Sequence, residues 1–141
     1  SSSAVTVRQS ILGRNLQGDP AAPSDCVRWG TAAVTSAGYN LIQAAGDLIG
    51  PGDCLFTAAG DIRGRDPLLT PLADRGGESW THGLLFGSPA IDAGPDVDCP
   101  PFDQRYVARP LDGDGDGLAV CDIGAFETAR VWGVFLPLVL R

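Results

Sequence analysis

The chain has 141 residues, enough for one domain with a hydrophobic core, and 44% of them are apolar, which argues against disorder. Its formal net charge is −7, and its ten basic residues, all arginine, form no cluster, which excludes nucleic acid as a partner. Its 19 glycines and 11 prolines predict short strands and many turns instead of long helices.

The first part of the chain predicts short strands. Ser3–Leu12 alternates apolar and polar residues and then shifts phase, which is typical of a strand with a bend. Gly38–Gln43 and Cys54–Thr57 are the next two predicted strands. VRQSILGRN and VTSAGYNLI share a loose pattern that places Asn15 and Asn40 at similar positions. A weak repeat of this kind is what one or two coils of a β-solenoid would show.

The later part of the chain is less regular. Prolines frame Asp66–Leu72, which predicts an extended segment because proline is excluded from a helix interior. Trp80–Phe86 is a further predicted strand, and Ala90–Asp92 and Asp122–Glu127 are short ones. We therefore expect loops and short strands that cover the end of the preceding coils.

The four cysteines, Cys26, Cys54, Cys99 and Cys121, allow three pairings, and no C-x-x-C motif supports zinc. The simplest pairing is sequential, Cys26 with Cys54 and Cys99 with Cys121. Each bridge would close a loop of about 20–30 residues and contribute about 3 kcal/mol. Two disulfides indicate an oxidising compartment, so we expect an extracellular or cell-surface protein. The alternative is four free buried thiols in a cytosolic protein.

Several short motifs together resemble a known family. They include GYNL, DPLL, GSPAIDAG, DQR and CDIGAFE. The chain is similar to the C-terminal end of secreted bacterial right-handed parallel β-helix surface proteins, which carry a CSLREA-type or choice-of-anchor region. The matching segments are Gly38–Leu41, Gly60–Asp61, Asp66–Leu69, Thr81–His82, Gly87–Gly94, Asp103–Arg105, Arg109–Pro110 and Cys121–Glu127. The resemblance implies a fold and an extracytoplasmic location, but no activity.

We therefore predict an all-β fold made of the last coils of a right-handed parallel β-helix, or β-solenoid. Residues 1–65 would form the terminal coils. Residues 66–128 would form an irregular, disulfide-stapled cap that contains GSPAIDAG and CDIGAFE, and residues 129–141 an apolar C-terminal strand or tail.

The acidic turn at residues 112–117 predicts a calcium site. Its alternating Asp and Gly residues place carboxylates around one centre, and Gly117 allows a sharp turn. An EF-hand loop would have Glu at its twelfth position, where this chain has Ile123, so the match is partial. The predicted ligands of Ca²⁺ are Asp112, Asp114, Asp116, Leu118 and Asp122. The alternative is a solvated acidic turn without an ion.

No catalytic residue is predicted. His82 is the only histidine and has no motif partner, and Ser88 lies outside a G-x-S-x-G motif. Asp92, Asp103 and Asp122 are candidates for a glycosidase carboxylate pair, but Asp beside Gly more often caps a turn.

The remaining polar and aromatic residues have both structural and functional interpretations. Arg105 and Arg109 are expected to form structural ion pairs with Asp103 and Glu127. The aromatic residues could stack on a sugar, but their scattered spacing favours packing. These aromatic residues are Trp29, Tyr39, Trp80, Tyr106 and Trp132.

The C-terminal segment Val131–Leu140 is strongly apolar, but its ten residues and Pro137 make it too short for a membrane-spanning helix. It could be a last strand packed on the cap, an anchoring or sorting signal, or a strand that pairs with a second copy. A head-to-tail contact of the last kind would build a fibre. The predicted self-association residues are Val131, Trp132, Val134, Phe135, Leu136, Leu138, Val139 and Leu140.

These patterns predict a non-catalytic extracellular structural or adhesive surface protein that self-assembles head-to-tail through its C-terminal strand. One alternative is a calcium-dependent carbohydrate-binding module that recognises cell-surface glycans. Another is a fragment of a polysaccharide-degrading β-helix enzyme.

Overall fold

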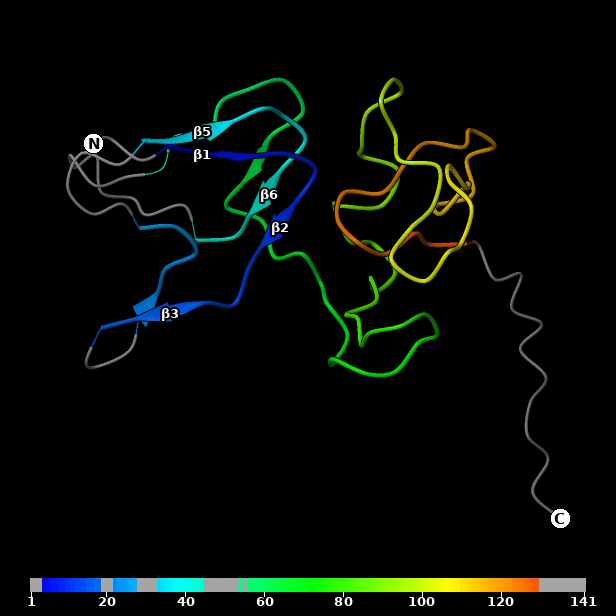
Figure 1. Cartoon of the computed structure of the whole chain (residues 1–141), viewed down its shortest axis with the longest axis horizontal. Coiled ribbons are helices and arrows are strands. Elements are labelled where there is room, and N and C mark those ends of the chain that lie inside the picture. The colour runs from blue at the N-terminus through cyan, green and yellow to red at the C-terminus, as the bar shows by residue number, and fades with distance from the viewer. Residues whose placement is uncertain (1–3, 19–21, 28–32, 45–53, 55, 130–141) are drawn as a thin grey trace, which may run out of the picture.

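The computed structural model describes residues 4–18, 22–27, 33–44, 54 and 56–129. The regular elements within these ranges are all β-strands. We call the described residues up to 65 the strand region and residues 66–129 the loop region. In Figure 1 the strand region, coloured blue to green, lies beside the loop region, coloured green to orange.

Parallel strand pairs organise the strand region. β1 (Ala4–Val7) pairs with β5 (Ala33–Ser36), and β2 (Ile11–Leu12) pairs with β6 (Leu41–Ile42). β6 also pairs with β7 (Ile62–Arg63), which makes a sheet of three strands. The bend predicted within residues 3–12 is present, because residues 8–10 separate β1 from β2.

The predicted parallel β-helix is wrong. The described strands form separate sheets of two, three and two strands, and the last of these, β3 (Leu16–Gln17) with β4 (Ala22–Pro23), is antiparallel. All seven strands lie in pairings of two to four residues that do not close into coils, and after β7 the described chain adds no further strand. The parallel ladder is therefore a local feature and not the start of a solenoid.

Two further expectations for the strand region fail. The predicted strand at residues 54–57 is absent, because the described residues Cys54, Phe56 and Thr57 have no strand geometry. The proposed equivalence of Asn15 and Asn40 is also wrong. Ile11 lies opposite Leu41, so the residue that corresponds to Asn40 is Ser10.

The hydrophobic core consists of two clusters. One lies within the strand region and contains Ile42, Cys54 and Phe56. The other joins the two regions, because Leu41 of β6 packs with Ile123 of the loop region. Its other buried members are Leu84 and Ala90, with Ile11, Ile62, Leu69, Ile91 and Ala93 packed against them. Since burying one such aliphatic side chain contributes about 1.5–3 kcal/mol, this cluster fixes the two regions together.

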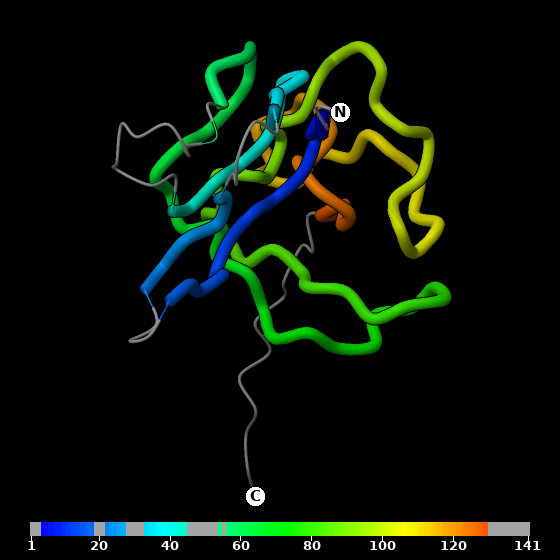
Figure 2. Tube along the Cα trace, turned by 60° about the vertical axis from the view of Figure 1, so that its left-hand side comes forward, coloured from blue at the N-terminus to red at the C-terminus, as the bar shows by residue number. Residues whose placement is uncertain are grey.

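The loop region is built from turns and isolated bridges. Leu69 pairs with Leu84 and Ala73 with Thr81, so only part of the strand predicted at residues 80–86 has a partner. The strands predicted at residues 90–92 and 122–127 are absent. Figure 2 shows this region as long winding loops. Hydrogen bonds to side-chain carboxylates hold parts of its backbone.

Each region contains one disulfide. Cys26 is bonded to Cys54 and Cys99 to Cys121, with Cα–Cα distances of 5.9 and 6.1 Å. This is the sequential pairing expected from the spacing. Two disulfides are consistent with an extracellular or otherwise oxidising environment. Among the described residues, no helix is long and apolar enough to cross a membrane.

Candidate functional site

The buried polar groups of the loop region are concentrated around Asp103. Its carboxylate accepts hydrogen bonds from the backbone N–H groups of Arg105, Val107 and Glu127, at 2.7, 3.0 and 3.0 Å. The Arg105 guanidinium also donates to it, and in addition donates to the carbonyl of Glu127 at 2.6 Å. One buried side chain therefore holds two segments that are separated by more than 20 residues in the sequence.

Glu127 forms a second centre. Its carboxylate, only 1% exposed, accepts hydrogen bonds from the backbone N–H groups of Leu111 and Asp122, at 2.8 and 3.0 Å. Arg109 Nε lies 3.2 Å from Glu127 Oε2, an ion-pair distance without the alignment of a hydrogen bond. The Arg109 guanidinium donates to the carbonyl of Gly124 at 2.7 Å. The predicted ion pairs of Arg105 and Arg109 are thus both present.

Asp122 and Asp92 connect the two signature motifs. Asp122, buried, accepts hydrogen bonds from the backbone N–H groups of Asp92 at 2.8 Å and Thr128 at 2.6 Å. The Asp92 carboxylate in turn accepts hydrogen bonds from the backbone N–H groups of Gly113 and Asp114, at 3.0 and 2.7 Å. These aspartates therefore accept hydrogen bonds mainly from segments that are distant in the sequence, and not from the adjacent turns that the sequence favoured.

The GSPAIDAG segment packs directly on the CDIGAFE segment. The Ile123 N–H donates to the carbonyl of Ala90 at 2.8 Å, and the Gly94 N–H donates to that of Cys121 at 2.6 Å. A Cβ at Gly94 would lie 2.6 Å from the Cys121 oxygen, so only glycine fits there. Ser88 donates to the carbonyl of Pro67 at 2.6 Å. The motif residues therefore serve contacts within the protein.

The pKa values of these carboxyls shift in different directions. Burial raises the pKa of Asp92, Asp122 and Glu127 above their usual values, and hydrogen bonds from backbone N–H groups oppose that rise only in part. Burial also acts on Asp103, but hydrogen bonds from Glu127, Arg105 and Val107 outweigh it, so the pKa of Asp103 is lowered. The carboxylate form is thus favoured most at Asp103.

The acidic turn brings together a different set of carboxylates from the one predicted. Asp112 and Asp114 meet Asp92, with one ligand oxygen of each lying within 4.8 Å of the others. Asp116 and Leu118 lie outside this group, and Asp116 accepts a hydrogen bond from the Leu118 N–H at 2.8 Å. Asp122 is used by the motif contacts described above. Of the five predicted ligands, the structure brings together Asp112 and Asp114 and adds Asp92.

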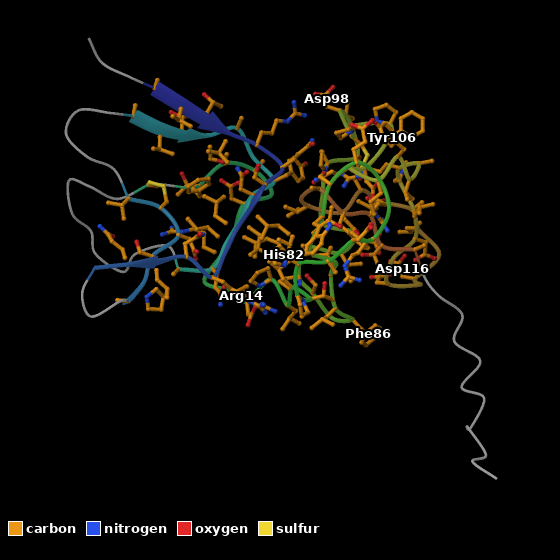
Figure 3. The ribbon with its side chains drawn as sticks, turned by 60° about the horizontal axis from the view of Figure 1, so that its bottom comes forward. Arg14, His82, Phe86, Asp98, Tyr106 and Asp116 are labelled. Carbon is orange, nitrogen blue, oxygen red and sulfur yellow. A yellow bond between two sulfur atoms is a disulfide. The ribbon has the colours of Figure 1, made fainter. Side chains whose placement is uncertain are left out.

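The other predicted residues are spread over the molecule. His82 lies between β2 and the loops of the loop region, while Tyr106 and Asp116 lie on the outer side of that region (Figure 3). Tyr39 has a positive φ of 55° and lies against Gly60, and it lines a different pocket from Trp80. The described aromatic residues therefore form no single platform. Trp29 and the eight predicted self-association residues of the C-terminal segment, Trp132 among them, lie outside the described residues.

The strand region contains a polar cluster that sequence reasoning missed. Asn40 is completely buried and donates hydrogen bonds to Val7 O, Ser36 Oγ and Asp61 Oδ1, at 3.1, 2.9 and 3.1 Å. Asp61 also accepts a hydrogen bond from Ser36 at 2.6 Å. The only sequence signal was the short GYN and GD motifs, whose glycines permit tight turns. The cluster joins three successive passes of the chain.

A scan against protein-family models, a search of curated proteins and a search of solved structures each found no match to this chain. The resemblance to bacterial surface proteins with a CSLREA-type or choice-of-anchor region therefore stays a prediction from the motifs alone. Function has to be argued from the geometry of the described residues.

Proposed function

We propose that the chain is a non-catalytic structural module of an extracellular protein. The observation that carries this proposal is how the loop region uses its buried carboxylates. Asp103, Asp122 and Glu127 each accept two or more hydrogen bonds from backbone N–H groups. A carboxylate committed in this way shapes loops and is not free to move a proton to or from a substrate. The two disulfides support placement in an oxidising compartment.

The Asp103→Asn variant tests this role against catalysis. A structural carboxylate predicts a lower melting temperature and no change in any polysaccharide-cleaving rate. The matched variant is Asp92→Asn, at another of the three candidate catalytic aspartates. Cleavage of a polysaccharide by the wild-type protein, abolished in either variant while the melting temperature is unchanged, would overturn the proposal.

A structural Ca²⁺ ion is a second proposal, favoured by the grouping of Asp92, Asp112 and Asp114. The negative charges of Asp112 and Asp114 add to burial in raising the pKa of Asp92, and a cation would relieve this repulsion. Hard oxygen ligands suit Ca²⁺. The expected result is heat release on calcium titration and a melting temperature that EDTA lowers.

The matched pair for the calcium test is Asp112→Asn and Asp116→Asn. Asp112 belongs to the cluster and Asp116 does not, although both lie in the same acidic turn. Only Asp112→Asn should abolish the heat of titration. Equal loss of the titration heat in both variants, or no heat with the wild-type chain, would contradict the proposed Ca²⁺ site.

Self-association through the apolar segment Val131–Leu140 is a third proposal, which rests on the sequence alone. We expect the full chain to form large oligomers in light scattering and filaments in electron micrographs. Deletion of residues 131–141 is expected to leave a folded monomer. Continued assembly of the truncated chain would exclude this segment as the contact.

A further inference from the structure

A cleft of about 630 Å³ lies between the strand region and the loop region. One wall comes from residues 8–11 leading into β2, and the other from residues 80–84 and 123–126. Figure 3 shows His82 at this position between the two regions. Ligand-binding pockets in proteins have volumes of roughly 300–1,000 Å³, so the cleft is large enough for a short oligosaccharide.

The cleft presents an exposed tryptophan on a fixed support. Thr81 pairs with Ala73 and is buried, so the neighbouring Trp80 and His82 project from the opposite side of this segment. Trp80 is 63% exposed. A Cβ at Gly77 would lie 2.8 Å from the Arg105 Cα, so the turn before Trp80 approaches the backbone at Arg105 as closely as glycine allows. The backbone on both sides of Trp80 is therefore held by the surrounding structure.

A second aromatic side chain, Phe126, also lines the cleft. The Arg105 guanidinium covers one side of its ring, at 3.5 Å from the centroid. Gln9, Asn15 and Gln104 belong to the same lining, and each side-chain amide donates a hydrogen bond within the protein. Aromatic faces together with amide groups are the combination that recognises sugars, which have an apolar C–H face and a rim of hydroxyl groups.

The charge of the cleft is opposite to that of the chain. The chain carries a net charge of −7, yet the described lining contains Arg8, His82 and Arg109 and no Asp or Glu. Arg109 is committed to Glu127, but Arg8 is half exposed and pairs with Asp98, also exposed, at 3.3 Å. An exposed ion pair of this kind is weak, so a ligand carboxylate can replace Asp98.

His82 offers one ring nitrogen to a ligand. Its Nδ1 lies 2.7 Å from the carbonyl oxygen of Thr70, which can only accept, so Nδ1 carries the proton of this hydrogen bond. No described residue forms a hydrogen bond with Nε2, which is the nitrogen left for a ligand. With the proton on Nδ1, Nε2 accepts a hydrogen bond, for example from a sugar hydroxyl group.

We propose that this cleft binds an acidic saccharide, with a sugar ring stacked on Trp80, its carboxylate held by Arg8 and a hydroxyl group donating to His82. This binding goes beyond the structural role proposed above and does not depend on it. The structural role concerns carboxylates that face the protein interior, whereas the cleft uses exposed aromatic and basic groups.

Calorimetric titration of the full chain with two tetrasaccharides tests the proposal. One is built from glucuronic acid and the other from glucose with the same linkage, so they differ only in the carboxylate groups. We expect the acidic compound to bind about tenfold more tightly, as loss of a charge-assisted hydrogen bond predicts. Trp80→Ala should weaken binding of the acidic compound about tenfold, and Trp80→Phe should restore most of it.

Two further variants separate the carboxylate contact from general effects. Arg8→Gln should lower affinity for the acidic compound to that of the neutral one and leave the neutral one unchanged. Phe86→Ala is the control, because Phe86 is more exposed than Trp80 and lies outside the cleft lining. Equal affinity for the two compounds would overturn the proposal in favour of a neutral saccharide. Absence of binding, or binding unaffected by Trp80→Ala in a normally folded variant, would overturn it altogether.

Discussion

The strand region and the loop region hold their backbones in different ways. In the strand region, the N–H groups of Leu41 and Gln43 donate to the carbonyls of Ser10 and Leu12 on the neighbouring strand. In the loop region, the N–H groups of Leu111, Asp122 and Glu127 donate to buried carboxylates. A ladder depends on the backbone and accepts many side chains, whereas a loop organised in this way depends on a few particular residues.

This difference predicts an unequal response to mutation. Polar substitutions at single buried sites should be most damaging in the loop region. The strand region has its own polar centre, Asn40 with Asp61, but the ladders of β1–β5 and β2–β6–β7 stand beside it. Among the residues described, the loop region has isolated bridges and no such ladder beside its polar groups.

The largest effect is expected from Glu127→Ala. The substitution frees the N–H groups of Leu111 and Asp122 and leaves the buried Arg109 without its ion-pair partner. Breaking a buried pair of this kind costs about 3–5 kcal/mol in the free energy of unfolding. Denaturant titration measures this cost. The control is Glu78→Ala, an exposed residue for which a change within about 0.5 kcal/mol is expected. Similar costs for the two variants would contradict the role given to Glu127.

The disulfides come next. The two bridges span similar separations of 28 and 22 residues, so replacing either cysteine pair by serine should cost about 3 kcal/mol. The two replacements should differ in which region of the chain is destabilised. Without Cys99–Cys121, hydrogen exchange should accelerate in the loop region and leave the β2–β6–β7 ladder protected. Uniform acceleration along the whole chain would show that the two regions unfold as one unit.

A smaller effect, opposite in sign at two aspartates, is expected from pH. The lowered pKa of Asp103 contributes stability above 3.8, which is lost as pH falls through its folded value. The raised pKa of Asp122 contributes stability below 3.8, which is lost as pH rises through its folded value. The cost of Asp103→Asn should therefore shrink on acidification, and the pH-dependent part of the cost of Asp122→Asn should grow. Thermal melts across acidic pH measure both, and parallel trends would contradict the assignment.

The sequence predicted local features better than long-range ones. The bend within residues 3–12, the sequential disulfides and the ion pair of Arg105 with Asp103 all follow from nearby residues or from simple counting. The β-helix was wrong because a loose repeat predicts that strands are parallel and does not predict whether they close into coils. The pattern shows neither how many strands join nor where the chain leaves the sheet.

The candidate site shows the same limit. Alternating Asp and Gly residues correctly marked an acidic turn, but the third member of its carboxylate group, Asp92, lies 21 residues before Gly113, whose N–H binds it. The partners of Glu127 are likewise brought together only by the fold. Long-range contacts of this kind leave no periodic pattern in a single amino-acid sequence. The cleft beside Trp80 has the same origin, because segments that are distant in the sequence line it.

Amide hydrogen exchange of the native protein, resolved by residue, tests the central claim most directly. If buried carboxylates organise the loop region, the N–H groups of Leu111, Asp122, Glu127 and Thr128 should be protected as strongly as those of Leu41 and Gln43 in the ladder. Exchange of these four amides at the rate of an unstructured chain, while the ladder stays protected, would contradict the account.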